Sequence, residues 1–260
     1  MSETVILEKD AGTARILLNR PETYNSFDLE MIDRFAGIMI SLTMDESVRV
    51  IVIAGQGKAF CAGGDLKWAL GFPAGPAAGF HELAACFHQA IREIRRTPKP
   101  VIAAVNGAAA GGGFSLALAC DFRVMAESAL LRQAFTSNGL SIDGGGTFSL
   151  PRLVGLARAI EIAAFDRPIP AAQALEWGLA TKVVPDGKAL DEALALAGEL
   201  QPRALQSFGL CKKLLTDSFD TSFETHIERE RLALAASAAG PDGREGLRAF
   251  VEKRRPNFRG

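Results

Sequence analysis

Two apolar runs, each followed by glycines, constrain the fold of this chain more than any other feature. Residues 48–55, VRVIVIAG, form an almost continuous β-branched run, and residues 99–107, KPVIAAVNG, read as a second strand that enters a glycine turn. Strands that are apolar on both faces are typical of a parallel sheet covered by helices. Up to about residue 185, such strand-like segments alternate with segments of helical spacing. We therefore predict an α/β layered fold.

Periodicity and turn residues predict the other elements. A hairpin is expected around the Asp-Ala-Gly turn at 10–12, and helices are expected over 79–98 and 147–165. Residues 73–80, PAGPAAGF, are rich in proline and glycine and are predicted to form a mobile loop. From about residue 188 onward the pattern is helical.

The composition argues against several classes of protein. The 260 residues carry a formal net charge of −1, which provides no basic field for nucleic acid. The cysteines are widely spaced and lie in no CxxC or Cys/His cluster, so we expect neither a metal site nor a disulfide framework. Residues 101–120 are long and apolar enough to suggest a membrane helix, but Asn106 and four glycines interrupt them. Because the N-terminal residues also lack a signal-peptide pattern, we expect a cytoplasmic protein without a membrane partner.

Two glycine-rich turns follow predicted strands, AFCAGGDL at 59–66 and NGAAAGGGF at 106–114. In α/β proteins, ligands usually bind beyond the carboxyl ends of the strands. Glycine lets the backbone approach closely, and two N–H groups from separate loops can hold one oxygen that develops negative charge. The alternative is that these glycines only permit tight turns and close packing. Neither turn has the pattern of a P-loop or of a dinucleotide-binding turn, so nucleotide binding is disfavoured.

Four ordered segments carry a resemblance to a known family: KAFCAGGDL (58–66), KPVIAAVNGAAAGGGFSLALACDFRVMAESALL (99–131), GLSIDGGGTFSLPRLVG (139–155) and REGLRAFVEKRRPNF (244–258). Together they resemble the crotonase superfamily, the enoyl-CoA hydratase/isomerase family. The resemblance implies a crotonase-like spiral of ββα units over residues 1–195 and a helical C-terminal region over 196–260 that joins homotrimers or homohexamers. It also implies an acyl-CoA substrate and no separate cofactor, because coenzyme A enters as part of the substrate.

The resemblance implies roles for individual residues. Gly64 and Gly112 match the positions whose N–H groups form the oxyanion hole of the family, and Gly112 begins a predicted helix, whose dipole favours negative charge. Contacts with coenzyme A are implied for Lys58, Ala62, Phe250 and Lys253. By their positions near these motifs, the candidates for the acyl pocket are Trp68, Phe72 and Leu140. Core packing is the alternative for the first two, and a solvated basic face is the alternative for Lys253.

Two positions depart from the hydratases of this family. Hydratases carry one glutamate two residues after the glycine triplet, where this chain has Ser115, and a second in a QPE segment, where it has Phe135. Because two carboxylates assist the addition of water to an enoyl thioester, ordinary hydratase activity is in doubt. Asp143, in SIDGGGT, matches the aspartate of the single-aspartate isomerases that resemble the phenylacetate-pathway ring-opening isomerase.

We therefore expect an enoyl-CoA double-bond isomerase in which Asp143 moves the proton and the oxyanion hole holds the enolate oxygen. Apolar neighbours favour a raised pKa for Asp143, whereas a helix N-terminus would lower it, so the net direction stays open. The structural alternative for Asp143 is an N-cap or Asx turn.

Other functions remain as alternatives. One is an enoyl-CoA hydratase with atypical residues, and another is an aroyl-CoA dehalogenase-like hydrolase in which Asp143 is the nucleophile and His88 assists it. For His88 the structural alternative is a helix residue with a hydrogen bond of its own. A hydrolytic triad of Ser115, His88 and Asp143 lacks the G-x-S-x-G elbow. The last alternative is a binding module that has lost its chemistry.

Overall fold

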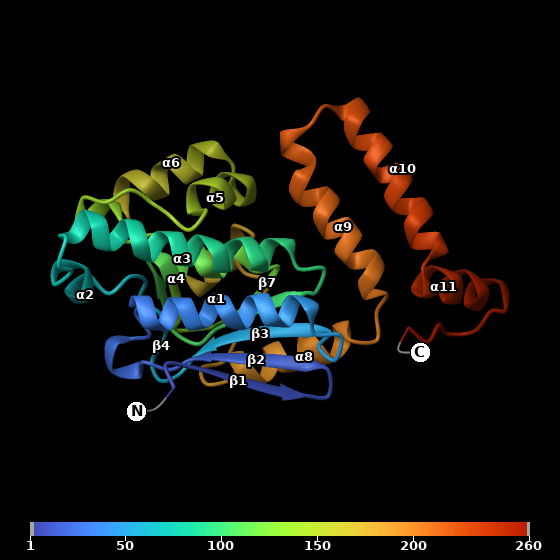
Figure 1. Ribbon diagram of the computed structural model, residues 1–260, viewed down its shortest axis with the longest axis horizontal. Coiled ribbons are helices and arrows are strands. Elements are labelled where there is room, and N and C mark those ends of the chain that lie inside the picture. The colour runs from blue at the N-terminus through green and yellow to red at the C-terminus, as the bar shows by residue number, and fades with distance from the viewer. Residues whose placement is uncertain (1–2, 259–260) are drawn as a thin grey trace.

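The computed structural model describes residues 3–258, and within them the strands form two sheets (Figure 1). The strands are β1 (Val5–Asp10), β2 (Thr13–Leu18), β3 (Val50–Gly55), β4 (Ala59–Cys61), β5 (Val101–Val105), β6 (Ala108–Ala110), β7 (Phe122–Ala126), β8 (Leu130–Arg132), β9 (Ile169–Pro170) and β10 (Lys182–Val184). The larger sheet has the order β1-β2-β3-β5-β7-β10, and the smaller has the order β4-β6-β8-β9. The hairpin β1–β2 is antiparallel as predicted, and the rest of the larger sheet is parallel.

The helices are α1 (Leu29–Met44), α2 (Leu66–Leu70), α3 (Pro76–Arg96), α4 (Gly112–Ala119), α5 (Gly146–Val154), α6 (Leu156–Phe165), α7 (Ala171–Glu176), α8 (Ala189–Leu200), α9 (Leu205–Asp217), α10 (Phe223–Ala239) and α11 (Pro241–Val251). Successive segments repeat one path, in which a strand of the larger sheet is followed by a strand of the smaller sheet and then by helix. The pairs β3–β4, β5–β6 and β7–β8 each follow this path. This repetition is the ββα spiral expected from the sequence.

The two apolar runs lie in the middle of the larger sheet, as β3 and β5. Helices α1 and α3 cover one face of this sheet and α8 covers the other (Figure 1). Val52 on β3 and Ala103 on β5 are fully buried, as are Phe35 and Met39 on α1. Burial on both faces is why neither strand alternates between apolar and polar residues.

Three local predictions were wrong. The expected loop 73–80 is helical from Pro76, because proline is favoured in the first turn of a helix, and Gly75 supplies the N-cap with φ +86°. The turn after β5 contains the short strand β6. The single helix expected over 147–165 is divided into α5 and α6 at Gly155, whose φ is +78°.

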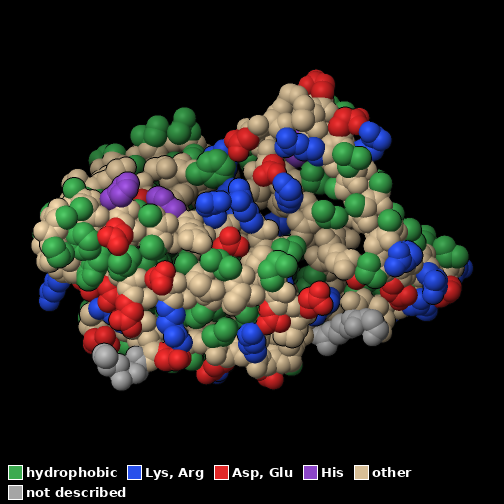
Figure 2. All heavy atoms as spheres, viewed as in Figure 1, with side chains coloured by type: hydrophobic (Ala, Val, Ile, Leu, Met, Phe, Trp, Pro, Cys, Tyr) green, Lys and Arg blue, Asp and Glu red, His purple; other side chains and the backbone are tan. Residues whose placement is uncertain are grey.

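The C-terminal helices α9, α10 and α11 contact one another and project from the rest of the molecule (Figure 1). Helix α8, which crosses the boundary predicted at residue 195, packs on β3, β5 and β7. Residues 1–2 and 259–260, the outer ends of the two predicted regions, lie outside the described residues. Hydrophobic side chains are exposed on α9 and α10, among them Leu215, Leu232 and Leu234, and Figure 2 shows hydrophobic atoms at the surface of this part of the molecule. Within residues 3–258, no helix combines the length and the apolar character that crossing a bilayer requires.

Candidate active site

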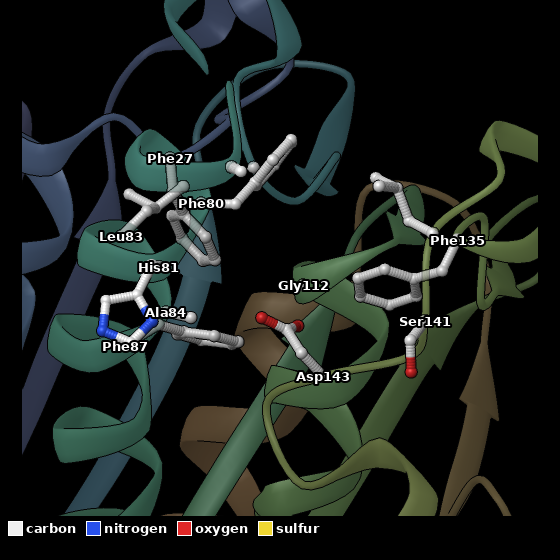
Figure 3. Close-up of a pocket in the computed structure, with 13 residues that line it drawn as sticks. Phe27, Phe80, His81, Leu83, Ala84, Phe87, Gly112, Phe135, Ser141 and Asp143 are labelled. Atoms are coloured by element: carbon white, nitrogen blue, oxygen red, sulfur yellow. The ribbon is translucent and has the colours of Figure 1, made fainter. Parts of the chain in front are cut away.

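A cavity of about 430 Å³ lies between α3 and the loops that follow β4, β6 and β8 (Figure 3). It brings together Gly64, Gly112 and Asp143, which come from three separate segments of the sequence. The rest of its wall is mostly apolar and consists of Phe27, Ala77, Phe80, His81, Leu83, Ala84, Phe87, Phe135, Leu140 and Ser141. The residues assigned to the catalytic centre from sequence therefore share one cavity.

The two glycine turns approach each other closely at this cavity. Gly63 has φ +91°, and a Cβ added there would lie 2.6 Å from the Gly112 nitrogen and 2.9 Å from the Ala110 oxygen. Only glycine fits such a position. Among the described residues, neither the Gly64 N–H nor the Gly112 N–H donates a backbone hydrogen bond. Two unpaired donors in the wall of one cavity can stabilise an oxyanion.

Asp143 does not cap the helix that follows it. Helix α5 begins at Gly146 with Gly145 as its N-cap, and within residues 3–258 no side chain accepts a capping hydrogen bond at this end. The N-cap alternative is therefore wrong. The Asp143 carboxylate points into the cavity (Figure 3), and its side chain keeps 35% of its exposure. An ionisable side chain lies close by, that of His88, whose Nε2 is 3.9 Å from Oδ2.

Burial raises the pKa of Asp143, and a positive charge on a protonated His88 would oppose this rise. Burial is the larger effect, which settles the direction that the sequence left open. A raised pKa makes a carboxylate a better proton acceptor when it is ionised. Asp143 thus has the position and the electrostatic environment of a general base.

Ser115 and His88 contact the backbone beside Asp143. The Ser115 hydroxyl donates to the Asp143 carbonyl oxygen at 2.7 Å, and the Gly144 N–H donates to His88 Nε2 at 3.2 Å. Ser115 is only 1% exposed and does not line the cavity. The hydrolytic triad is therefore not assembled, because the Ser115 hydroxyl and His88 Nε2 each bond a backbone group and do not bond each other.

The acyl-pocket candidates separate into two groups. Leu140 lines the cavity, as does Phe135, whereas Trp68 and Phe72 do not. The last two rings pack on each other with centroids 5.2 Å apart. A Cβ added at Gly79 would lie 3.0 Å from the Phe72 Cβ, so Phe72 also packs against α3. Trp68 and Phe72 thus pack against each other outside the cavity, as the core-packing alternative expected.

One face of α3 supplies the wall that sequence reasoning missed. Ala77, Phe80, Ala84 and Phe87 recur at three- and four-residue intervals, which places them on one side of a helix. This spacing was visible in the sequence. It was overlooked because its first part fell in the segment predicted to be a loop.

The residues implied to hold coenzyme A do not meet within one chain. Lys58 and Ala62 are exposed beside the Gly63–Gly64 turn. Phe250 is 83% exposed on α11, and Lys253 follows it closely. Helix α11 lies at the opposite end of the molecule from α2 and the start of α3 (Figure 1).

Comparison with known proteins adds to this geometry. Residues 8–260 match the model of a family described as enoyl-CoA hydratase/isomerase. The chain belongs to the enoyl-CoA hydratase/isomerase family. One relative in this family, the 1,2-epoxyphenylacetyl-CoA isomerase of Escherichia coli strain K12, is 37% identical, with all of both chains covered. The crotonyl-CoA hydratase of Syntrophomonas wolfei is 34% identical, with 98% of each chain covered.

Solved structures of the family support the fold. An enoyl-CoA hydratase from Polaromonas sp. JS666 superposes with a TM-score of 0.92 at 35% identity, covering 97% of this chain and 98% of that one. An enoyl-CoA hydratase from Bacillus anthracis also has a TM-score of 0.92, at 33% identity, covering 99% of this chain and 100% of the other. The predicted crotonase fold is confirmed.

Proposed function

We propose that this protein is an enoyl-CoA double-bond isomerase that uses Asp143 as its single acid/base. One observation carries the proposal. Among the described residues, Asp143 is the only carboxylate in the wall of the cavity that also holds the unpaired Gly64 and Gly112 N–H groups. A single carboxylate is sufficient to take a proton from one carbon and return it to another.

The proposed reaction begins with the thioester carbonyl oxygen between the Gly64 and Gly112 N–H groups. The Asp143 carboxylate takes a proton from the carbon α or γ to the thioester. The electron pair of the broken C–H bond delocalises into a dienolate, and the two N–H groups stabilise the charge on its oxygen. The protonated Asp143, whose proton exchanges with solvent, then delivers a proton to the other end of the dienolate, which moves the double bond and restores the carboxylate.

The sequence differences and one relative support this choice. Ser115 and Phe135 stand at the two positions where the family hydratases carry glutamate, so water lacks the usual pair of carboxylates. The Escherichia coli relative is named as an isomerase and shares 37% identity. We further propose that Lys58 and Ala62 contact the coenzyme A of their own chain, whereas Phe250 and Lys253 contact that of a neighbouring copy in a homotrimer or homohexamer.

Hydration is the second candidate, since the relative from Syntrophomonas wolfei is named as a crotonyl-CoA hydratase. The nucleophilic, dehalogenase-like reaction has less support. It requires a base near Asp143, and His88 Nε2 already accepts the Gly144 N–H.

The test compares the wild type with Asp143→Asn on crotonyl-CoA, 3-hexenoyl-CoA and 4-chlorobenzoyl-CoA in deuterated water. We expect the wild type to convert the 3-enoyl substrate to the 2-enoyl product, with deuterium entering at the α or γ carbon. Asp143→Asn should lose this activity by a factor of roughly 10² to 10⁴, the usual contribution of a general base.

Other outcomes would select other functions. Fast formation of 3-hydroxybutyryl-CoA without double-bond migration would contradict the isomerase and favour the hydratase. Release of chloride would favour the nucleophilic reaction. Full activity of Asp143→Asn on every substrate would show that Asp143 is not the acid/base.

A further inference from the structure

The peptide group between Asp143 and Gly144 is held at both of its polar ends. Its carbonyl oxygen accepts hydrogen bonds from the Ser115 hydroxyl at 2.7 Å and from the Gly146 N–H at 3.0 Å. Its N–H group donates to His88 Nε2 at 3.2 Å. Both ends of one planar unit are therefore fixed, and the unit cannot rotate without breaking these bonds.

The contacts of this peptide group fix the backbone from which the Asp143 side chain extends. Among the described residues, the Asp143 carboxylate has no hydrogen bond of its own, and its distance of 3.9 Å from His88 Nε2 is too long for one. Gly144 follows with φ +59°, a conformation that glycine adopts readily. At Asp143 and Gly144 the loop is therefore held by hydrogen bonds of its peptide group and not by hydrogen bonds of side chains at these two positions.

We propose that Ser115 and His88 are positioning residues that clamp the Asp143–Gly144 peptide group and so aim the Asp143 carboxylate at the substrate. The clamp rests on the proposed function, because it serves a proton transfer by Asp143. Neither residue touches the reacting atoms in this role. Displacement of the carboxylate should slow proton transfer, since misplacement of a reacting group by about 1 Å can lower a rate about 100-fold.

The clamp also determines which ring nitrogen of neutral His88 carries the proton. A ring nitrogen that accepts an N–H hydrogen bond must carry a lone pair, and an imidazolium ion has none. The proton of neutral His88 is therefore on Nδ1 while the clamp is closed. His88 acts here as a hydrogen-bond acceptor, and it does not serve as the cation or the base of the nucleophilic mechanism.

Ser115 is suited to its end of the clamp by its small size. A Cβ added at Gly144 would lie 2.9 Å from the Ser115 Cβ, and one added at Gly146 would lie 2.8 Å from its Oγ. The loop rests directly on this side chain, which leaves room for little beyond a hydroxyl. Serine supplies the donor that the carbonyl needs within that space.

The test uses His88→Phe, which removes the acceptor but keeps a ring, His88→Gln, which restores an acceptor at similar reach, and Ser115→Ala. On 3-hexenoyl-CoA we expect kcat to fall about 10-fold in His88→Phe and in Ser115→Ala, as for the loss of one hydrogen bond, with KM changed less than about twofold. His88→Gln should recover most of the lost kcat. Matched controls are Gln89→Phe, at an exposed position on α3, and Ser149→Ala, at a buried serine of α5, and both should keep the wild-type kcat.

A second measurement separates the clamp from the proposed function. Hydrogen exchange of the Gly144 amide should be faster in His88→Phe than in the wild type and slow again in His88→Gln, whatever reaction the protein catalyses. Failure of the wild type to isomerise any enoyl-CoA would overturn the function but leave this exchange result as the test of the clamp. Unchanged exchange in His88→Phe would overturn the clamp, as would a His88→Gln variant as slow as His88→Phe or a loss of activity confined to KM.

Discussion

Replacement of Gly144 by alanine should damage both stability and catalysis. A Cβ at this position would lie 2.3 Å from Cε1 of Phe87 and 2.9 Å from the Ser115 Cβ. Phe87 is buried and its ring lies 5.2 Å from that of Phe27, so it cannot swing aside without disturbing the core. The loop must therefore move, and Asp143 moves with it.

The expected destabilisation has two parts. Alanine in the left-handed region costs about 1–2 kcal/mol, because Gly144 has φ +59°. Overpacking a filled core costs about 1–3 kcal/mol more. We therefore expect Gly144→Ala to lower the free energy of unfolding by about 2–5 kcal/mol.

Gly145→Ala is the matched control. Gly145 has φ +74°, but a Cβ there would lie 3.8 Å from its nearest neighbour, Ile91, which is ordinary contact. This variant should lose only the backbone part, about 1–2 kcal/mol. The gain from restricting the unfolded chain is the same for both replacements and cancels in the comparison.

Urea unfolding measures both variants, and steady-state assays with 3-hexenoyl-CoA measure their kcat under conditions where each is folded. Gly144→Ala should lose more than 10-fold in kcat, because the carboxylate is displaced. Equal losses of stability in the two variants would refute the packing argument. A Gly144→Ala variant with wild-type kcat would refute the link between the loop and Asp143.

Three further predictions concern other parts of the molecule. Asp143→Asn should unfold at an equal or higher temperature than the wild type at pH 7. The pKa of Asp143 is raised in the folded state, so its charged form destabilises that state once the pH exceeds the usual carboxyl range. A thermal scan at pH 3.5 should therefore show a smaller difference between the two proteins. Lys212→Met should lower the free energy of unfolding in urea by about 3–5 kcal/mol. The variant leaves the mostly buried Asp121 carboxylate, now 2.7 Å from Lys212 Nζ, without its partner. Adding Asp121→Asn to this variant should recover part of the loss. Phe250→Ala should raise KM for acyl-CoA substrates without changing kcat in the steady-state assay, and an unchanged KM would contradict the proposed contact with coenzyme A.

The strands and most helices could be predicted from the sequence, because their burial leaves a periodic or continuous apolar pattern. Residues 50–54 and 101–105 are apolar throughout since helices cover both faces of their sheet. The errors occurred where one residue type is common in two kinds of local structure. Pro76 after Gly75 has the composition of a loop, but it is also a common way to begin a helix.

Gly64, Gly112 and Asp143 could be located from the sequence because they stand in motifs that resemble those of a known family. The wall could not be located in the same way. Phe27 and Phe87 have the pattern of core residues, and only the three-dimensional packing shows that one side of each ring borders an open space. The clamp on Asp143 was also hidden, since hydrogen bonds between a side chain and the backbone of another segment leave no spacing in the sequence.

The loop that carries Asp143 packs directly on the side chain at position 115. A Cβ added at Gly144 or Gly146 would lie only 2.8–2.9 Å from the Ser115 side chain, so we expect that a glutamate at 115 could not extend past the loop. At the other hydratase position, the Phe135 ring forms part of the cavity wall. Ser115→Glu should therefore displace Asp143 instead of adding a partner to it, and we expect it to lose isomerase activity without gaining hydration of crotonyl-CoA. A Ser115→Glu variant that hydrates crotonyl-CoA faster than the wild type would show that the loop yields, and that residue identity at 115, and not the path of the loop, decides the reaction.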